Sequence, residues 1–267
     1  MTLILDHPVF LLCILFLVYV SAVEVGFRLA IATGANSDRE HRKQISTSRD
    51  SLGVLLSLLL GFTLAMAMPR YDLRRQLVLE EANAIGTTSL RGELLPEPQR
   101  GQVHELLRQY VETRLAYSRG GLHENQTIAA IGRSKELQSA LWENAKAAAS
   151  QRPTPVVALF VSSLNDTIDL SEKRLSALQN RIPPTIWIML TVMALLTCLT
   201  IGYGERHRFW LVSIITPLMI AIVMGLIADL DSSRSGFLRV DLRSMERLYR
   251  DFQSETPAPV PPSSPAR

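Results

Sequence analysis

Apolar and charged residues alternate in long blocks along this chain of 267 residues. Four stretches are apolar and carry almost no charge: 8–27, 52–68, 185–203 and 209–228. A bilayer core about 30 Å thick is crossed by roughly 20 apolar helical residues, and only helices or closed barrels satisfy their own backbone there. These runs lack the alternation of barrel strands. The pattern therefore predicts an all-α integral membrane protein with four transmembrane helices.

A charged region, residues 69–182, separates the second predicted span from the third. Within it, apolar residues recur at spacings of three and four in the segments 99–119, 127–149 and 156–181, which is the period of an amphipathic helix. Proline and glycine interrupt the pattern between these segments. We therefore expect a helical extramembrane domain between the second and third spans, built as a bundle.

The same pattern divides the rest of the chain. Residues 1–68 hold the first pair of spans, joined by a polar loop over 33–50, and residues 183–229 hold the second pair, joined by a tight hairpin. A polar segment follows at 230–253. The last stretch, 254–267, is rich in proline and serine and is expected to be disordered.

The second span carries small residues at an unbroken spacing of four: Gly53, Ser57, Gly61 and Ala65. Such a stripe allows another helix to approach closely. A pore-lining face has the same composition, because small side chains leave room for an ion. Both interpretations stay open, and helix packing is the one the pattern favours.

Two ionisable residues lie in the first span. Glu24 and Arg28 are four positions apart and so share one helix face. Ionisable residues within a span are candidate functional residues. The alternative is an interfacial pair in which Arg28 reaches the headgroups.

Two acidic groups follow spans. Glu80, Glu81 and Asn83 come about three turns after the second span, where they would form either a charged ring at a pore mouth or a polar network on a solvated helix face. Asp229 and Asp231 end the fourth span and offer carboxylates to a cation, or serve the structure alone.

Composition narrows the function classes. The net charge is only +3 and no basic cluster is interleaved with aromatics, so nucleic-acid binding is not predicted. The two cysteines, Cys13 and Cys198, lie in apolar stretches and form no metal-ligand motif. No HExxH, GxSxG or GxxxxGK[ST] motif occurs. We expect neither an enzyme nor a cofactor or metal site.

The distribution of basic residues leaves the orientation open. The short connections carry Arg39, Arg42, Lys43, Arg49, Arg206 and Arg208, which places them in the cytoplasm by the positive-inside rule. Several arginines also flank the spans on the opposite side, next to the central domain.

Three segments carry a family resemblance: LLLGFTLAMAMPRYDLRRQLVLEEANAIGTTSLRGELLPEPQR, LNDTIDLSEKRLSALQNRIPPTIW and ADLDSSRSGFLRV. Together they span about 52–240 and resemble the bestrophin-like domain family of bacterial membrane proteins. Bestrophins are anion channels that assemble as pentamers around a central pore. The resemblance implies a self-associating, multi-pass protein of the bacterial inner membrane, with the second span lining a path for inorganic ions.

Two functions follow as hypotheses. One is a homo-oligomeric ion channel of bestrophin-like type, selective for anions. The other is a non-conducting membrane sensor or scaffold whose helical domain binds a partner or ligand.

Overall fold

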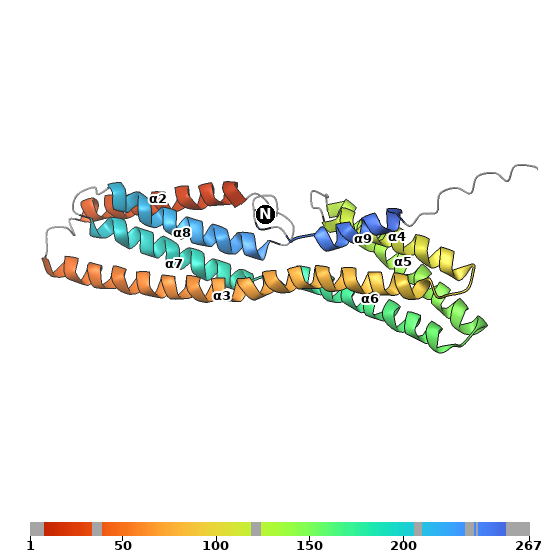
Figure 1. Ribbon diagram of the computed structural model, residues 1–267. Helices are drawn as coiled ribbons and strands as arrows, with labels where there is room; N and C mark the ends of the chain where they lie inside the picture. Colours follow the sequence, from red (N-terminus) through yellow and green to blue (C-terminus); the bar gives the residue numbers. More distant parts are fainter. Residues whose placement is uncertain are drawn as a thin grey trace, which may run out of the picture. The chain divides into compact units, whose positions relative to one another are not determined.

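The computed structural model describes residues 8–33, 39–118, 124–205, 210–232, 238 and 240–254. Within these ranges every regular element is an α-helix, and no strand occurs (Figure 1). The helices are α2 (Pro8–Thr33), α3 (Arg39–Gly92), α4 (Gln99–Ser118), α5 (Glu124–Gln151), α6 (Pro155–Gln179), α7 (Pro184–Gly204), α8 (Trp210–Asp231) and α9 (Arg243–Ser254). The predicted all-helical class is confirmed.

Four stretches of the described chain are long and apolar enough to cross a membrane. They lie within Phe10–Thr33, Lys43–Gly92, Pro155–Gly204 and Ser213–Asp231. Each overlaps one of the predicted apolar blocks. Proline stands at the start of α7, where its missing N–H costs no helical hydrogen bond. The prediction of four transmembrane helices is therefore confirmed.

The prediction of a polar loop over 33–50 was wrong for most of that range, because α3 already begins at Arg39. Residues 39–50 contain neither glycine nor proline, and their arginine, lysine and glutamine residues are good helix formers. The helix also continues through Pro69 to Gly92, 54 residues in all. The polarity of residues 39–50 indicated only that they lie outside the hydrocarbon core, not whether they are helical.

The predicted polar segment 230–253 contains a further helix, α9, whose Met245 and Phe252 are buried. The predicted disordered tail is outside the described residues from 255 onward, as is the hairpin loop at 206–209.

The chain forms two compact units. The membrane unit comprises Met1–Leu73 and Leu178–Arg239, and the helical unit comprises Arg74–Ala177 and Val240–Arg267. Helix α3 contributes its first part to the membrane unit and its last part to the helical unit.

In the membrane unit, α2 packs along α7 and α8 (Figure 1). Leu190, Ala194 and Cys198 recur every four residues on the fully buried side of α7. Leu56 and Leu60 bring the buried face of α3 to the same core. The apolar residues on the other side of α3 remain exposed, as expected for helices that contact lipid.

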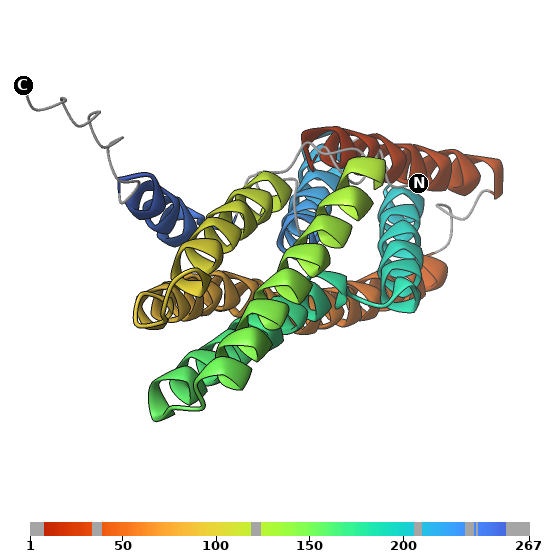
Figure 2. The ribbon, with the colours of Figure 1, turned by 90° about the vertical axis from the view of Figure 1, so that its right-hand side faces the viewer.

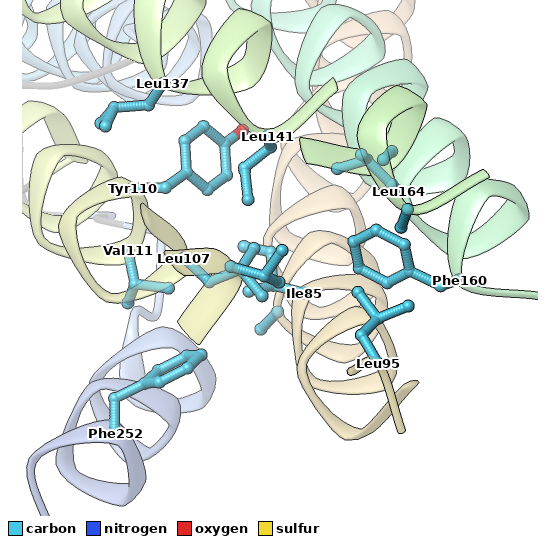
Figure 3. Packing of buried hydrophobic residues seen from close by; sticks show 14 of the residues in the cluster. Ile85, Leu95, Leu107, Tyr110, Val111, Leu137, Leu141, Phe160, Leu164 and Phe252 are labelled. Carbon is cyan, nitrogen blue, oxygen red and sulfur yellow. The ribbon is translucent and has the colours of Figure 1, made fainter. Parts of the chain in front are cut away.

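In the helical unit, five helices enclose one apolar core. Figure 3 shows side chains converging from α3 (Ile85), α4 (Leu107, Tyr110), α5 (Leu137, Leu141), α6 (Phe160, Leu164) and α9 (Phe252). Helices α4 and α5 pack against each other, and α5 passes into α6 through a short turn at residues 152–154 (Figure 2). The His104 and Phe252 rings pack edge to face, with ring centroids 5.3 Å apart, and this contact attaches α9 to α4.

Candidate functional site

The small-residue stripe of α3 faces away from the rest of its own membrane unit. Ser57, Gly61 and Ala65 are exposed, and Gly53 is half-buried. A Cβ atom added to Gly53 or Gly61 would meet no heavy atom within 4 Å. No described helix of the same chain therefore packs closely on this stripe.

The opposite face of α3 is the packed one. Leu56, Leu60 and Ala67 are buried in the core of the membrane unit, and Thr63 is buried beside them. The large apolar side chains next to the stripe, including Val54, Leu58 and Phe62, are exposed. The stripe thus faces outward from the single chain, where it would contact lipid, another copy of the chain or an aqueous path.

Close helix packing within the chain occurs instead between α2 and α7. A Cβ on Gly26 would collide with the carbonyl oxygen of Leu199, and a Cβ on Gly202 would collide with that of Val23. Glycine at both positions lets the two backbones touch. This contact was hard to predict from the sequence, because each glycine is isolated rather than part of a regular stripe.

Glu24 and Arg28 form an ion pair on one face of α2. Arg28 Nε donates to Glu24 Oε1 at 2.8 Å, and 76% of the Arg28 side chain is exposed. Glu24 also lines a cavity of about 150 Å³ together with Glu205 and Ser213. The Ser213 hydroxyl lies 3.1 Å from both carboxylate oxygens of Glu205 and donates to that group.

Glu81 lies at the centre of a buried ionic network in the helical unit. Arg114 of α4 donates to its carboxylate through Nε at 2.7 Å and through Nη2 at 3.1 Å. Arg174 of α6 donates to Oε2 of the same carboxylate. All three side chains are at least nine-tenths buried. One carboxylate therefore joins α3, α4 and α6.

Neutral groups complete this network. The Tyr110 hydroxyl donates to Glu81 at 3.2 Å and accepts from Gln138 Nε2 of α5 at 3.2 Å. Arg174 Nη2 donates to the Ser118 hydroxyl. The Arg114 guanidinium lies 5.6 Å from the centre of the Tyr117 ring, a cation–π distance.

Both guanidinium groups stabilise the Glu81 carboxylate, whereas burial and the neighbouring Arg114 charge lower the pKa of Arg174 despite its contact with Glu81. Burial by itself would raise the pKa of the Glu81 carboxyl, but Arg114 and Arg174 outweigh burial and lower that pKa below its ordinary value. Burial raises the pKa of Tyr110 to about 12, and the neighbouring Glu81 charge acts in the same direction. The network thus holds an ionised carboxylate, two guanidinium groups and a neutral phenol at pH 7.

Glu80 and Asn83 do not join Glu81. Glu80 is half-buried and accepts from Gln76 Nε2 at 2.7 Å, and Asn83 is exposed. Residues one or two positions apart on a helix point in different directions. The sequence analysis missed Arg114 and Arg174. Arg114 did leave a signal, because it follows Leu107 and Tyr110 on the apolar side of α4.

Asp229 and Asp231 hold backbone groups near the end of α8. Asp231 accepts from the Ile182 N–H at 2.9 Å, and Asp229 accepts from the Leu238 N–H at 3.0 Å. Among the described residues, no group of three or more His, Cys, Asp and Glu side chains is arranged to hold a metal ion. In these two contacts the carboxylates act as structural acceptors.

Comparison with known proteins places this geometry in a family. No curated protein matched the chain. A variant of a bestrophin homologue from Klebsiella pneumoniae is 12% identical and has a TM-score of 0.65, with 92% of this chain and 97% of that chain covered. Another variant of that homologue is 11% identical with a TM-score of 0.67, and the coverage is 91% and 98%.

A third solved structure, described as a membrane protein, is 14% identical with a TM-score of 0.68 and covers 95% of this chain and 99% of its own. These similarities establish the fold. The model of the bestrophin-like domain matches residues 15–245, most of the chain. The protein therefore belongs to the bestrophin-like domain family.

Proposed function

We propose that this protein is a homo-oligomeric ion channel of a bacterial cell membrane, and that the small-residue stripe of α3 lines its pore. The observation that carries the proposal is the outward exposure of Ser57, Gly61 and Ala65 in a chain of bestrophin-like fold. A stripe used for packing within the chain would be buried, as Gly26 and Gly202 are.

The packing of the membrane helices also supports a pore formed by several copies of the chain. Within one chain, α2, α7 and α8 pack directly on one another around a core of apolar side chains. A close-packed core has no continuous path for hydrated ions. An aqueous path would form between copies, along a helix face that each copy leaves uncovered.

Anion selectivity is the finer part of the proposal. An acidic ring at a pore mouth favours cations, and Glu81 was a candidate member of such a ring. Its carboxylate is instead enclosed by Arg114 and Arg174, with no exposed side-chain surface. Glu81 therefore supplies no negative charge to an aqueous path, which removes one feature that would have favoured cations over anions.

Cysteine accessibility in liposomes tests the pore. The background carries Cys13→Ala and Cys198→Ala, which removes both native thiols. Ser57→Cys or Gly61→Cys is then treated with a charged, membrane-impermeant thiol reagent while halide flux is followed. We expect modification to change the flux at both positions. Ile222→Cys on α8, also exposed in one chain, is the matched control and should not respond.

Two results would overturn the proposal. One is an equal change in halide flux when Ile222→Cys and Gly61→Cys are treated with the thiol reagent. The other is the absence of flux for chloride, sodium and potassium gradients while mass photometry shows an intact oligomer. The second result would favour the sensor or scaffold function, and a stoichiometric partner recovered on the helical unit would then support it.

A further inference from the structure

A groove separate from the α3 stripe lies within the membrane unit. It has a volume of about 390 Å³ and lies between the last turns of α2, the first turns of α3 and the last turns of α7. Apolar walls come from Leu29, Ile45 and Leu199, and polar groups come from Gln44, Ser48, Thr200 and Tyr203. The lining is mostly apolar, so the groove is suited to an occupant with a hydrocarbon part.

The groove is located where spans end. Helix α2 ends at Thr33 and α7 ends at Gly204. The hydroxyls of Thr33 and Tyr203 are 3.1 Å apart and join these two ends. Tyrosine at the end of a span is typical of the boundary between hydrocarbon and headgroups. An occupant would therefore have one part at hydrocarbon depth and one part at headgroup depth.

Contact between α3 and α7 closes one side of the groove. The Cγ2 atom of Ile45 lies 3.5 Å from the position that a Cβ on Gly204 would take, which is ordinary van der Waals distance. The first turns of α3 therefore form a wall supported by α7. Gln44 and Ser48 are exposed and four positions apart on this wall, so their amide and hydroxyl groups are available side by side.

The charge near the polar wall is positive. Lys43 is exposed and directly precedes Gln44. Arg49 follows Ser48 and is paired with Asp50 at 3.1 Å, and among the side chains that the structure describes no carboxylate pairs with Lys43. In sequence, the two short connections between spans are also basic, with Arg39 and Arg42 before Lys43 and with Arg206 and Arg208. Anionic lipids are the complementary partner of basic residues next to a membrane span.

We propose that this groove binds one anionic phospholipid. An acyl chain lies along Leu29, Ile45 and Leu199, and the phosphate accepts hydrogen bonds from Gln44 and Ser48 beside the Lys43 charge. Lipid is the medium that surrounds a membrane-spanning unit, so the occupant is available wherever the groove opens. The site does not depend on ion conduction.

Native mass spectrometry of the full-length protein tests the site. The protein is purified in detergent and titrated with phosphatidylglycerol, and phosphatidylcholine with the same acyl chains is the charge control. We expect tighter retention of phosphatidylglycerol. Lys43→Glu should weaken it by about tenfold, because it replaces an attraction for the anionic headgroup with a repulsion.

Ser48→Phe is the second variant, since a large ring on the polar wall occupies the groove. It should abolish the preference for phosphatidylglycerol, whereas Ser51→Phe, exposed on α3 but outside the groove lining, should keep it. The thermal midpoint of each variant is measured with and without phosphatidylglycerol. Both Lys43→Glu and Ser48→Phe should lose the lipid-dependent increase, and Ser51→Phe should retain it.

Three outcomes would overturn the proposal. The first is equal retention of the two lipids by the native protein. The second is unchanged phosphatidylglycerol binding in both Lys43→Glu and Ser48→Phe. The third is loss of the oligomer in Ser48→Phe with lipid binding intact, which would show that a second copy of the chain occupies the groove.

Discussion

Gly26 and Gly202 lie where α2 packs against α7, and the backbone of the partner helix fills the space that a side chain at either position would need. A Cβ on either glycine would collide with a backbone carbonyl of the other helix. In a membrane, helices associate largely through such close van der Waals contact, because lipid supplies little hydrophobic drive. The two glycines therefore set how closely the first and third spans pack.

Alanine at either glycine should destabilise the protein. Gly26→Ala and Gly202→Ala force the backbones apart, and overpacking of this kind costs about 1–3 kcal/mol. The measurement is the thermal midpoint in detergent, followed by circular dichroism. Gly61→Ala is the matched control, because its added methyl meets nothing within 4 Å. A decrease for Gly61→Ala as large as that for Gly202→Ala would contradict the assignment.

Removing the Glu81 charge should destabilise the helical unit strongly. Glu81→Gln leaves Arg114 and Arg174 buried without their carboxylate, and breaking a buried pair in this way costs about 3–5 kcal/mol. Chemical unfolding of the full chain in detergent measures the loss. Glu105→Gln removes a carboxylate from an exposed pair with Arg108, at 2.7 Å, and should cost less than about 1 kcal/mol. Similar losses for the two variants would contradict a central role for Glu81.

The stability of the helical unit should fall in acid because of Glu81. The unfolded carboxyl takes up a proton near its ordinary pKa of 4.5, whereas the folded carboxyl has a lower pKa. Between these two values the unfolded state binds more protons, so stability is full above the unfolded pKa and is lost as the pH falls through the folded pKa. Unfolding measured from pH 7 to acid should show this decrease, and Glu81→Gln should flatten it.

The contribution of Glu105 to the loss of stability in acid must be distinguished from that of Glu81. Hydrogen bonds from Arg108 and Gln109 lower its pKa to about 2, but its side chain is about half exposed. Salt screens exposed charges much more than buried ones. The acid decrease assigned to Glu81 should therefore persist at high salt, and a decrease that disappears there would point to surface pairs instead.

Asp231 should stabilise the entry into the third span. Its carboxylate accepts from the Ile182 N–H, two residues before α7 begins. Asp231→Ala leaves this buried N–H without that acceptor, at a cost of about 1–3 kcal/mol. The thermal midpoint is again the measurement. Asp166→Ala, at an exposed position of α6, should stay within about 0.5 kcal/mol of the native protein. Equal effects would argue against the structural role of Asp231.

The spans were predictable because their signal is local. A run such as 52–68 must be helical in a bilayer whatever it packs against, since its backbone has no other hydrogen-bond partners there. The helix over Arg39–Asp50 was not foreseen, because polarity excludes a segment from the hydrocarbon core without saying whether it is coiled or helical. Similarly, α9 gains its order from Met245 and Phe252, which are buried against distant residues.

The candidate site was only partly predictable. The stripe from Gly53 to Ala65 could be found by its spacing, but spacing alone could not say which way it faces. Glu81 was singled out with Glu80 and Asn83 as neighbours in sequence. Its partners, Arg114 and Arg174, are 33 and 93 residues away.

The sequence by itself thus determined the class of the protein: helices, four of them apolar enough to span a membrane, around a charged helical region. These properties depend on backbone hydrogen bonding and on the hydropathy of each segment alone. Only the tertiary structure decided that Gly26 and Gly202 are the packed glycines, that Gly61 faces outward, and that Glu81 is neutralised inside the helical unit. Burial and pairing depend on which helix faces come together, and that is a property of several segments at once.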